Sequence, residues 1–387
     1  MQKNTDAVDK LIKSLPAWEW STTWSLLAAC GASGLWLRKR GDGIKGSPMA
    51  ISLIVALVLA NLGILPNFSP AYAIVLKKLA ALAIPLLLFD SDLEKAGSAT
   101  RKLLPAYGVA MLATVLGTLI AWPCLLMFLE PASIESGLIL ASALCAKHIG
   151  GSLNYDAVCA ACSAPLPLIA TGIAADNAIV APFLILLFRL ASTGVKTPEI
   201  DDTDDDDPPD KATASNTASA LALAFACITP AAVLGPTYAL LPGAAAAALL
   251  ASGLARSSVK KITPGARVLG LLITQLYVAT IGATSGTINN ISVAGIPLAL
   301  FSLFQLSIHF LVLKFANRFF PKTLDNRSLA LASSAAVGGP SAALAMCASQ
   351  GWTNLILPAL LVGFSGYFSG TFIALSLFDL FYRSVPY

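Results

Sequence analysis

Apolar residues run through most of this chain in long continuous stretches, separated by short polar segments. Most stretches are about 17 to 25 residues long, which is the length that an α-helix needs to cross a bilayer. They do not show the ten-residue alternation of membrane β-strands. The pattern predicts an all-α polytopic membrane protein. The stretches lie near residues 21–37, 48–65, 72–89, 103–129, 134–160, 166–190, 217–253, 266–287, 293–316, 328–348 and 354–380.

Composition agrees with this interpretation. The 387 residues are 56% hydrophobic and 12% charged, more apolar than one or two soluble cores could bury. The formal net charge of +4 is spread over short loops and does not form a face that follows phosphates. We therefore expect a lipid bilayer as the surroundings and no nucleic-acid partner.

The segments on either side of residues 21–195 differ in character. Residues 1–20 place Val8, Leu11 and Ile12 on one helical face opposite lysines, and three tryptophans follow, which predicts an amphipathic interfacial helix. We expect no cleavable signal or transit sequence there. Residues 196–218 carry seven aspartates between 201 and 210, which predicts a disordered acidic linker. Calcium binding is not expected, because the run lacks spaced ligands and a turn glycine.

The linker divides the chain into a first transmembrane half at 21–195 and a second at 219–387. Four basic segments, at 38–45, 95–102, 256–267 and 314–327, should lie on one side of the membrane. All four agree only if residues 217–253 cross an odd number of times. We therefore expect about eleven spans, with ten to twelve allowed: one N-terminal span and two halves of five.

A short repeat relates the halves. Ile149-Gly150-Gly151-Ser152 matches Val337-Gly338-Gly339-Pro340, and each motif interrupts an apolar run that precedes a long final span. An odd number of crossings between them would invert the repeats. Inverted repeats with interrupted helices in corresponding places are typical of secondary transporters.

The first interruption combines glycines with charge. Lys147 and His148 precede Gly150 and Gly151, which fall roughly 20 Å into a ~30 Å core. An unwound backbone there must line a cavity or be buried in protein, and its half-helix ends can bind ions. Close packing of two helices is the alternative for the glycines. His148 is equally well explained as a structural or as a titrating group.

The next span carries Asp176 and Asn177 near its middle. An ionised carboxylate there costs several kcal/mol unless it is paired or coordinated, so Asp176 is a candidate carrier of H⁺ or Na⁺. The oxygens of Asn177 and Asn154 suit Na⁺, which makes these three residues the hypothetical sodium ligands. A structural ion pair with Lys147 is the alternative.

Three further residues are candidates for an access path. Asp90 and Asp92 end one span and would either cap it or attract cations, and Thr280 lies among hydroxyls that also suit helix packing. Ser341 follows the second Gly-Gly motif and joins the candidate binding residues.

Enzymatic activity is not expected. Ser365 lies in a GxSG sequence like that of intramembrane serine proteases, but both histidines precede it. We expect no cofactor beyond a coupling Na⁺ or H⁺, and interpret the seven cysteines as small buried apolar residues.

Four motifs in order resemble the YjcL-type family of uncharacterised membrane proteins of bacteria and of plant and algal plastids. The resemblance covers residues 48–380. It rests on the following segments: Lys147–Tyr155, Ala174–Asn177, Ile281–Ala283, and Val337–Ala343 followed by Gly351-Trp352.

That family is grouped by fold with cation/proton antiporters and sodium/bile-acid symporters. The resemblance implies two discontinuous helices that cross, at 134–160 and 328–350, with Asp176 on the span after the first. Antiporters of this fold often have two adjacent acids, whereas this chain has Asp176-Asn177. Its last span also lacks a central Lys or Arg.

Three hypotheses follow. The first is a Na⁺- or H⁺-coupled secondary transporter, a cation/proton antiporter that moves like an elevator, with Asp176 as carrier and backbone groups at Gly150 and Gly338 assisting. The second is a sodium symporter that binds an organic anion at half-helix ends. The third is a non-transporting scaffold or assembly factor. We expect a plastid or bacterial plasma membrane and allow for a homodimer.

Overall fold

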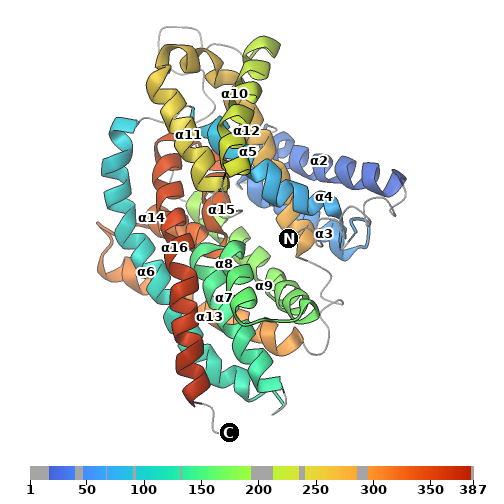
Figure 1. Ribbon diagram of the computed structural model, residues 1–387, viewed down its shortest axis with the longest axis vertical. Coiled ribbons are helices and arrows are strands. Elements are labelled where there is room, and N and C mark those ends of the chain that lie inside the picture. Colours follow the sequence, from blue (N-terminus) through green and yellow to red (C-terminus); the bar gives the residue numbers. More distant parts are fainter. Residues whose placement is uncertain are drawn as a thin grey trace. The chain divides into compact units, whose positions relative to one another are not determined.

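The computed structural model describes residues 17–39, 47–66, 68–89, 93–130, 133–192, 212–234, 240–285 and 295–384, and every regular element in these segments is a helix (Figure 1). Six of the described helices are long and apolar enough to cross a membrane, which makes the chain an integral membrane protein. The helices are α2 (Ala17–Lys39), α3 (Pro48–Asn61), α4 (Pro70–Ala73), the π-helical turn η1 (Ile74–Leu79), α5 (Ala80–Leu88), α6 (Leu93–Leu126), α7 (Ile134–Gly150), α8 (Ser152–Ala161), α9 (Leu166–Ser192), α10 (Ala214–Leu234), α11 (Leu240–Leu254), α12 (Arg256–Thr284), α13 (Ile296–Phe319), α14 (Asn326–Val337), α15 (Gly339–Gln350) and α16 (Thr353–Ser384).

The helices form two compact units. Unit 1 comprises Met1–Phe89 and Asp210–Thr287, and unit 2 comprises Asp90–Pro209 and Ile288–Tyr387. Each unit therefore takes one stretch from either side of the acidic linker. Unit 2 contains α6 to α9 and α13 to α16, and with them both Gly-Gly motifs and Asp176.

Glycines let the helices of unit 1 approach closely. A Cβ atom on Gly282 would lie 2.4 Å from the Leu53 carbonyl oxygen, so α12 and α3 pack backbone to backbone. A buried hydrogen bond of 2.7 Å between Ser52 Oγ and Gln275 Oε1 joins the same two helices. Small residues and interhelical hydrogen bonds are the usual means of association in lipid, where the hydrophobic effect does not act between helices.

Both interruptions predicted from the sequence are present in unit 2. Helix α7 ends at Gly150 and α8 starts at Ser152, with Gly151 at a φ of 93°. Helix α14 ends at Val337 and α15 starts at Gly339, which has a φ of 73°. Positive φ angles of this kind favour glycine, because a Cβ atom would clash with the backbone.

The chain reverses direction at the first interruption. Gly172 of α9 packs so closely on α7 that an added Cβ would lie 2.9 Å from Leu140 Cδ2, and further along α9 Asp176 contacts Lys147 and His148. Residue numbers rise together on α7 and α9, so these helices run parallel. Helix α8, which connects α7 to α9 along the chain, must therefore run antiparallel to both. Helices α7 and α8 form a helical hairpin.

The second interruption is also a hairpin. The Arg327 guanidinium, at the start of α14, lies 4.2 Å from the ring centroid of Trp352, just beyond the end of α15. A continuous helix would separate these residues by on the order of 35 Å. The chain thus enters and leaves this element at the same end. The two halves of each interrupted element thus lie side by side, which differs from the continuous pair of crossing helices that the resemblance implied, although both breaks lie at the predicted glycines.

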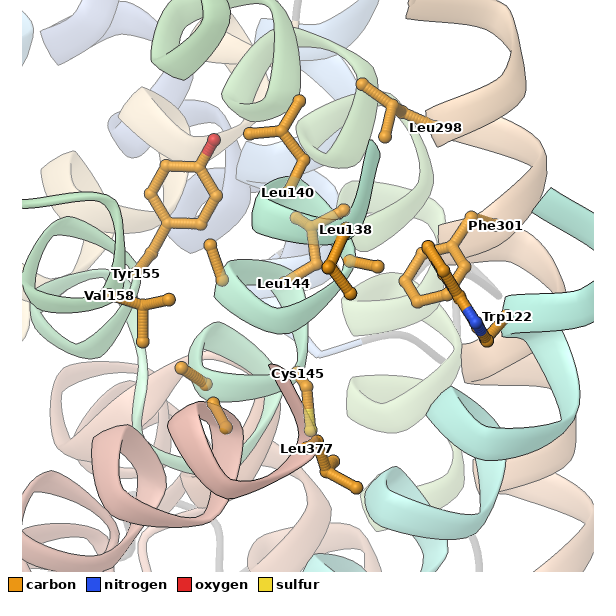
Figure 2. Packing of buried hydrophobic residues seen from close by; sticks show 14 of the residues in the cluster. Trp122, Leu138, Leu140, Leu144, Cys145, Tyr155, Val158, Leu298, Phe301 and Leu377 are labelled. Carbon is orange, nitrogen blue, oxygen red and sulfur yellow. The ribbon is translucent and has the colours of Figure 1, made fainter. Parts of the chain in front are cut away.

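The hairpin tips meet. A Cβ atom on Gly339 would lie 3.4 Å from the Gly150 carbonyl oxygen and 3.4 Å from Gly151 Cα. Apolar residues of α6, α7, α8, α13 and α16 form the core around the first hairpin, and Figure 2 shows Leu140 and Leu144 of α7 with Tyr155 and Val158 of α8. This core holds the hairpin in place.

Some boundaries differ from the predictions. Residues 217–253 form two helices, α10 and α11, and α10 begins at Ala214, inside the predicted linker. Residues 1–16 of the predicted interfacial helix lie outside the described residues, and so do the acidic residues 201–210, Asp90 and Asp92; residues 17–20 belong to α2.

Candidate functional site

Asp176 is the centre of a polar cluster at the end of the first hairpin. Its side chain is fully buried on α9. Oδ2 lies 2.6 Å from Lys147 Nζ, and Oδ1 accepts a hydrogen bond of 2.6 Å from Ser302 Oγ of α13. Lys147 also donates to Asn177 Oδ1 at 2.9 Å. The structure thus brings Lys147, Asp176 and Asn177 together as the sequence suggested.

His148 is a second basic side chain next to Asp176. Its Nε2 lies 3.0 Å from Asp176 Oδ1, but the contact is not aligned as a hydrogen bond. The other ring nitrogen, Nδ1, lies 2.8 Å from Gln305 Oε1. A buried carboxylate is tolerated only when it is paired and hydrogen-bonded, and these contacts meet that condition for Asp176.

The hydrogen bonds beyond Gln305 fix the tautomer of His148. Thr118 Oγ1 donates to the Thr114 carbonyl oxygen at 2.8 Å, so it must accept from Gln305 Nε2, which lies 2.6 Å away. The amide oxygen of Gln305 then faces His148, and Nδ1 carries a hydrogen that it donates. In a neutral ring, Nε2 would accordingly present its lone pair to the carboxylate.

The facing atoms of His148 and Asp176 define a candidate proton site. With a hydrogen on Nδ1, a neutral His148 ring turns the lone pair of Nε2 toward Asp176 Oδ1, 3.0 Å away, and two lone pairs at this distance repel each other. A proton on either atom removes this repulsion.

The polar chain extends deeper into unit 2. Thr114 Oγ1 lies 3.0 Å from His309 Nδ1 and 3.0 Å from the His148 carbonyl oxygen. His309 Nε2 lies 2.9 Å from Ser333 Oγ of α14. Both histidines therefore belong to one buried network. Lys147 is its least buried charged member, with 8% of its surface exposed.

Asn154 lies apart from this network. Its Nδ2 donates to the Gly366 and Tyr367 carbonyl oxygens and to Thr371 Oγ1 of α16, each at 3.1 Å. Its buried Oδ1 has no hydrogen-bond partner among the described residues. The amide thus holds α8 against α16.

The other predicted residues divide into two groups. Gly150, Gly151, Gly338, Gly339 and Ser341 lie at the meeting tips of the hairpins. Thr280 lies in unit 1, where its hydroxyl donates to the Leu276 carbonyl oxygen of its own helix. In the described part of unit 1 it is thus engaged in a local helix bond.

Sequence reasoning missed the second layer of the network. Ser302, Gln305 and His309 recur at a helical spacing within an otherwise apolar span, and Thr114 and Thr118 are one turn apart. These two polar stripes, each on one face of an apolar span, were the sequence features that indicated a larger buried network. Their partners could not be assigned, because the contacts join helices that are far apart in sequence.

Comparisons with known proteins agree with the membrane fold. The family model described as "Protein of unknown function (DUF819)" matches residues 25–383. The chain belongs to this family. It is also 26% identical over 395 residues to the "Uncharacterized membrane protein YjcL" of Bacillus subtilis (strain 168), an alignment that covers 94% of this chain and 96% of that protein. The matched residues include both Gly-Gly motifs and Asp176.

Proposed function

We propose that the protein is a secondary transporter driven by protons, with Asp176 and His148 sharing the coupling proton beside Lys147. The observation that carries the proposal is the buried cluster of these three groups at the end of a helical hairpin. Ionisable groups within membrane spans are rare and are typical of proton or ion pathways. The family and the helical membrane fold are compatible with a transporter without naming its solute.

The hairpins suggest a revised topology. If neither hairpin crosses the bilayer, ten crossings remain: α2, α3, the α4–α5 span, α6, α9, α10, α11, α12, α13 and α16. With ten crossings, all four basic segments lie on one side of the membrane if residues 217–253 cross twice. If the two interrupted elements also crossed, residues 217–253 would have to cross an odd number of times. Each half has five crossings and one hairpin, so the repeats are inverted and the hairpins enter from opposite sides.

Proton exchange can drive movement of the hairpin. Loss of the shared proton leaves the Nε2 lone pair of His148 facing the Asp176 carboxylate, and the resulting repulsion weakens this arrangement. Gain of the proton restores it. We expect the cluster to bias unit 2, which carries both hairpins, between two states in an elevator-like cycle.

Sodium coupling is the second candidate. The buried Asn154 Oδ1, which has no partner among the described residues, is the observation that favours it. Against it, the oxygens of Asp176 and Asn177 accept hydrogen bonds from Lys147, so Na⁺ would have to displace the ammonium group. We therefore favour H⁺ over Na⁺. The scaffold hypothesis instead predicts that deletion of residues 201–210 abolishes function.

Proton flux in proteoliposomes tests the proposal. Full-length protein would be reconstituted with a pH-sensitive dye inside, and gradients of Na⁺, K⁺ or Li⁺ chloride and of carboxylate salts would be imposed. We expect at least one gradient to move protons, Asp176→Asn to abolish the movement, and Asp379→Asn to preserve it. Asp379 is an exposed acid paired with Arg383. Unchanged flux in Asp176→Asn, or no proton movement under any gradient, would refute the proposal.

A further inference from the structure

The open end of the second hairpin has an arginine that lies over a buried aromatic ring. The guanidinium carbon of Arg327 is 4.2 Å from the ring centroid of Trp352, and Trp352 is only 4% exposed. A guanidinium group held on an aromatic face loses little further freedom when it binds a ligand. Arg327 is therefore positioned by the fold itself.

The same guanidinium group has donors that the chain does not use. Arg327 makes no ion pair with any described residue, and its Nη1 and Nη2 reach the surface without a hydrogen-bond partner among those residues. Asp325 is the only acid between residues 314 and 327, and its Oδ1 accepts a hydrogen bond of 2.6 Å from Ser328 N. The two terminal nitrogens of Arg327 are thus open to an anion from outside the chain.

Two buried N–H groups add to the positive character of this end. One is Nε1 of Trp352 itself, and the other is Nε2 of Gln350, two residues earlier in the chain; neither has an acceptor among the described residues. The hydrogens of these groups carry partial positive charge, so they favour an anion over a cation nearby. Because both atoms are buried, they act through their charge and not by contact with a ligand.

This end of the hairpin also belongs at the membrane surface. It follows the basic segment 314–327, which the charge distribution assigns to the basic side of the membrane. Asn317 Nδ2 donates to the Leu324 carbonyl oxygen at 2.8 Å, so the turn before Arg327 folds back on α13. Three phenylalanines around this turn are 60–65% exposed: Phe315, Phe319 and Phe320. Exposed aromatic and basic side chains together are typical of a surface at the boundary of lipid and water.

We propose that Arg327, seated on Trp352, binds the phosphate group of an anionic phospholipid in the leaflet on the basic side of the membrane. Two phosphate oxygens accept from Nη1 and Nη2 at once, in a planar fork that an ammonium group cannot reproduce. A zwitterionic headgroup suits the site less well, because it brings a second cation to a surface that is already positive. The exposed phenylalanines offer apolar contacts to the acyl chains.

The bound lipid would anchor the open end of the second hairpin to the bilayer. It is a structural ligand and not a solute of the carrier, so the inference goes beyond the proposed proton coupling and does not depend on it. A negative result in the proton-flux experiment would leave the lipid site standing, and loss of the lipid site would leave the proton proposal standing.

Lipid-dependent unfolding of the purified full-length protein tests the inference. The melting temperature would be measured in a neutral detergent with phosphatidylglycerol, with phosphatidylcholine or with inorganic phosphate, at equal ionic strength. A ligand that binds the folded state raises the melting temperature by mass action. We expect phosphatidylglycerol to raise it most, phosphatidylcholine to raise it less, and inorganic phosphate, which has no acyl chains, to leave it unchanged.

Three variants make the test specific. Arg327→Met should weaken the binding of phosphatidylglycerol about tenfold, as expected for the loss of hydrogen bonds between charged groups. Arg327→Lys should weaken it nearly as much, because the charge stays and the fork is lost. Lys322→Met removes an equal charge from an exposed position in the same segment and should have a much smaller effect. Native mass spectrometry measures these affinities separately from any change in folding stability.

Four outcomes would overturn the inference. Equal stabilisation by phosphatidylglycerol and phosphatidylcholine would show that the headgroup charge is not recognised. Equal affinities of Arg327→Met and Lys322→Met would reduce the site to general attraction between a basic segment and an anionic surface. Full binding by Arg327→Lys would remove the role of the guanidinium fork. Stabilisation by inorganic phosphate as large as that by phosphatidylglycerol would assign the site to a free anion.

Discussion

At its tip the first hairpin has Lys147-His148-Ile149-Gly150-Gly151, and the second has Ala335-Ala336-Val337-Gly338-Gly339 at the matching positions. The glycines make the same reversal in both, with a positive φ at Gly151 and Gly339. The charges occur only in the first. The reversal therefore depends on the glycines, which both hairpins have, whereas only the first hairpin has ionisable side chains at its tip.

The hairpins are also anchored differently. The first is joined at its tip by the contacts of Lys147 and His148 with α9 and α13. The second is joined at its open end by the stacking of Arg327 on Trp352. The tip of the first hairpin should accordingly govern coupling, and the open end of the second should govern stability alone.

Removing Lys147 should have the largest effect. Lys147→Met leaves the Asp176 carboxylate buried without its closest partner, and we expect a loss of about 3–5 kcal/mol in the free energy of unfolding. The double variant Lys147→Met/Asp176→Leu should recover most of that stability but no transport. Denaturant unfolding in detergent measures both, with the exposed Lys260→Met as control. If the losses in free energy of unfolding of the two single variants simply added in the double variant, this would contradict a direct interaction between Lys147 and Asp176.

Adding a Cβ atom at either hairpin tip should lower the stability of the protein by a similar amount. We expect Gly151→Ala and Gly339→Ala each to cost about 1–2 kcal/mol, since a Cβ atom is unfavourable at these positive φ angles. Gly253→Ala is the control, because nothing lies within 4 Å of an added Cβ there. Thermal unfolding checks the values. A large difference between the two tips would argue against a shared design.

Replacing Gln305 should change both stability and the pH dependence of proton flux, whereas replacing Gln350 should change neither. Gln305→Leu removes the acceptor of His148 Nδ1, and we expect a cost of about 1–3 kcal/mol and an altered pH dependence of proton flux. Gln350 Nε2, near the end of the second hairpin, has no partner among the described residues, so Gln350→Leu should be nearly neutral. Equal pH profiles of proton flux for Gln305→Leu and wild type would show that Gln305 takes no part in proton coupling.

The contact at the open end of the second hairpin should give the smallest effect. Arg327→Met removes a cation–π interaction, which contributes about 0.5–2 kcal/mol. We expect lower stability and the same ratio of protons to solute, with Lys322→Met as the control. A changed ratio would show that the second hairpin also takes part in coupling.

The sequence predicted most of the apolar helices and both glycine breaks, and it gave the contact of Lys147 with Asp176 as one alternative, because each follows from local periodicity or from the cost of charge in lipid. It did not reveal the direction of α8. A Gly-Gly break permits either a continued or a reversed helix, and the reversal is seen in contacts between residues far apart in the chain, such as Gly172 with Leu140. The network through Gln305 and His309 required the same tertiary information.

The most direct test of the central claim is infrared difference spectroscopy of the reconstituted protein between high and low pH. A protonated carboxyl group gives a C=O stretching band distinct from that of a carboxylate. We predict a pH-dependent band of this kind in the wild type and in Asp379→Asn that is absent in Asp176→Asn and shifted in His148→Gln. An identical band in Asp176→Asn would contradict the claim that Asp176 and His148 share the coupling proton.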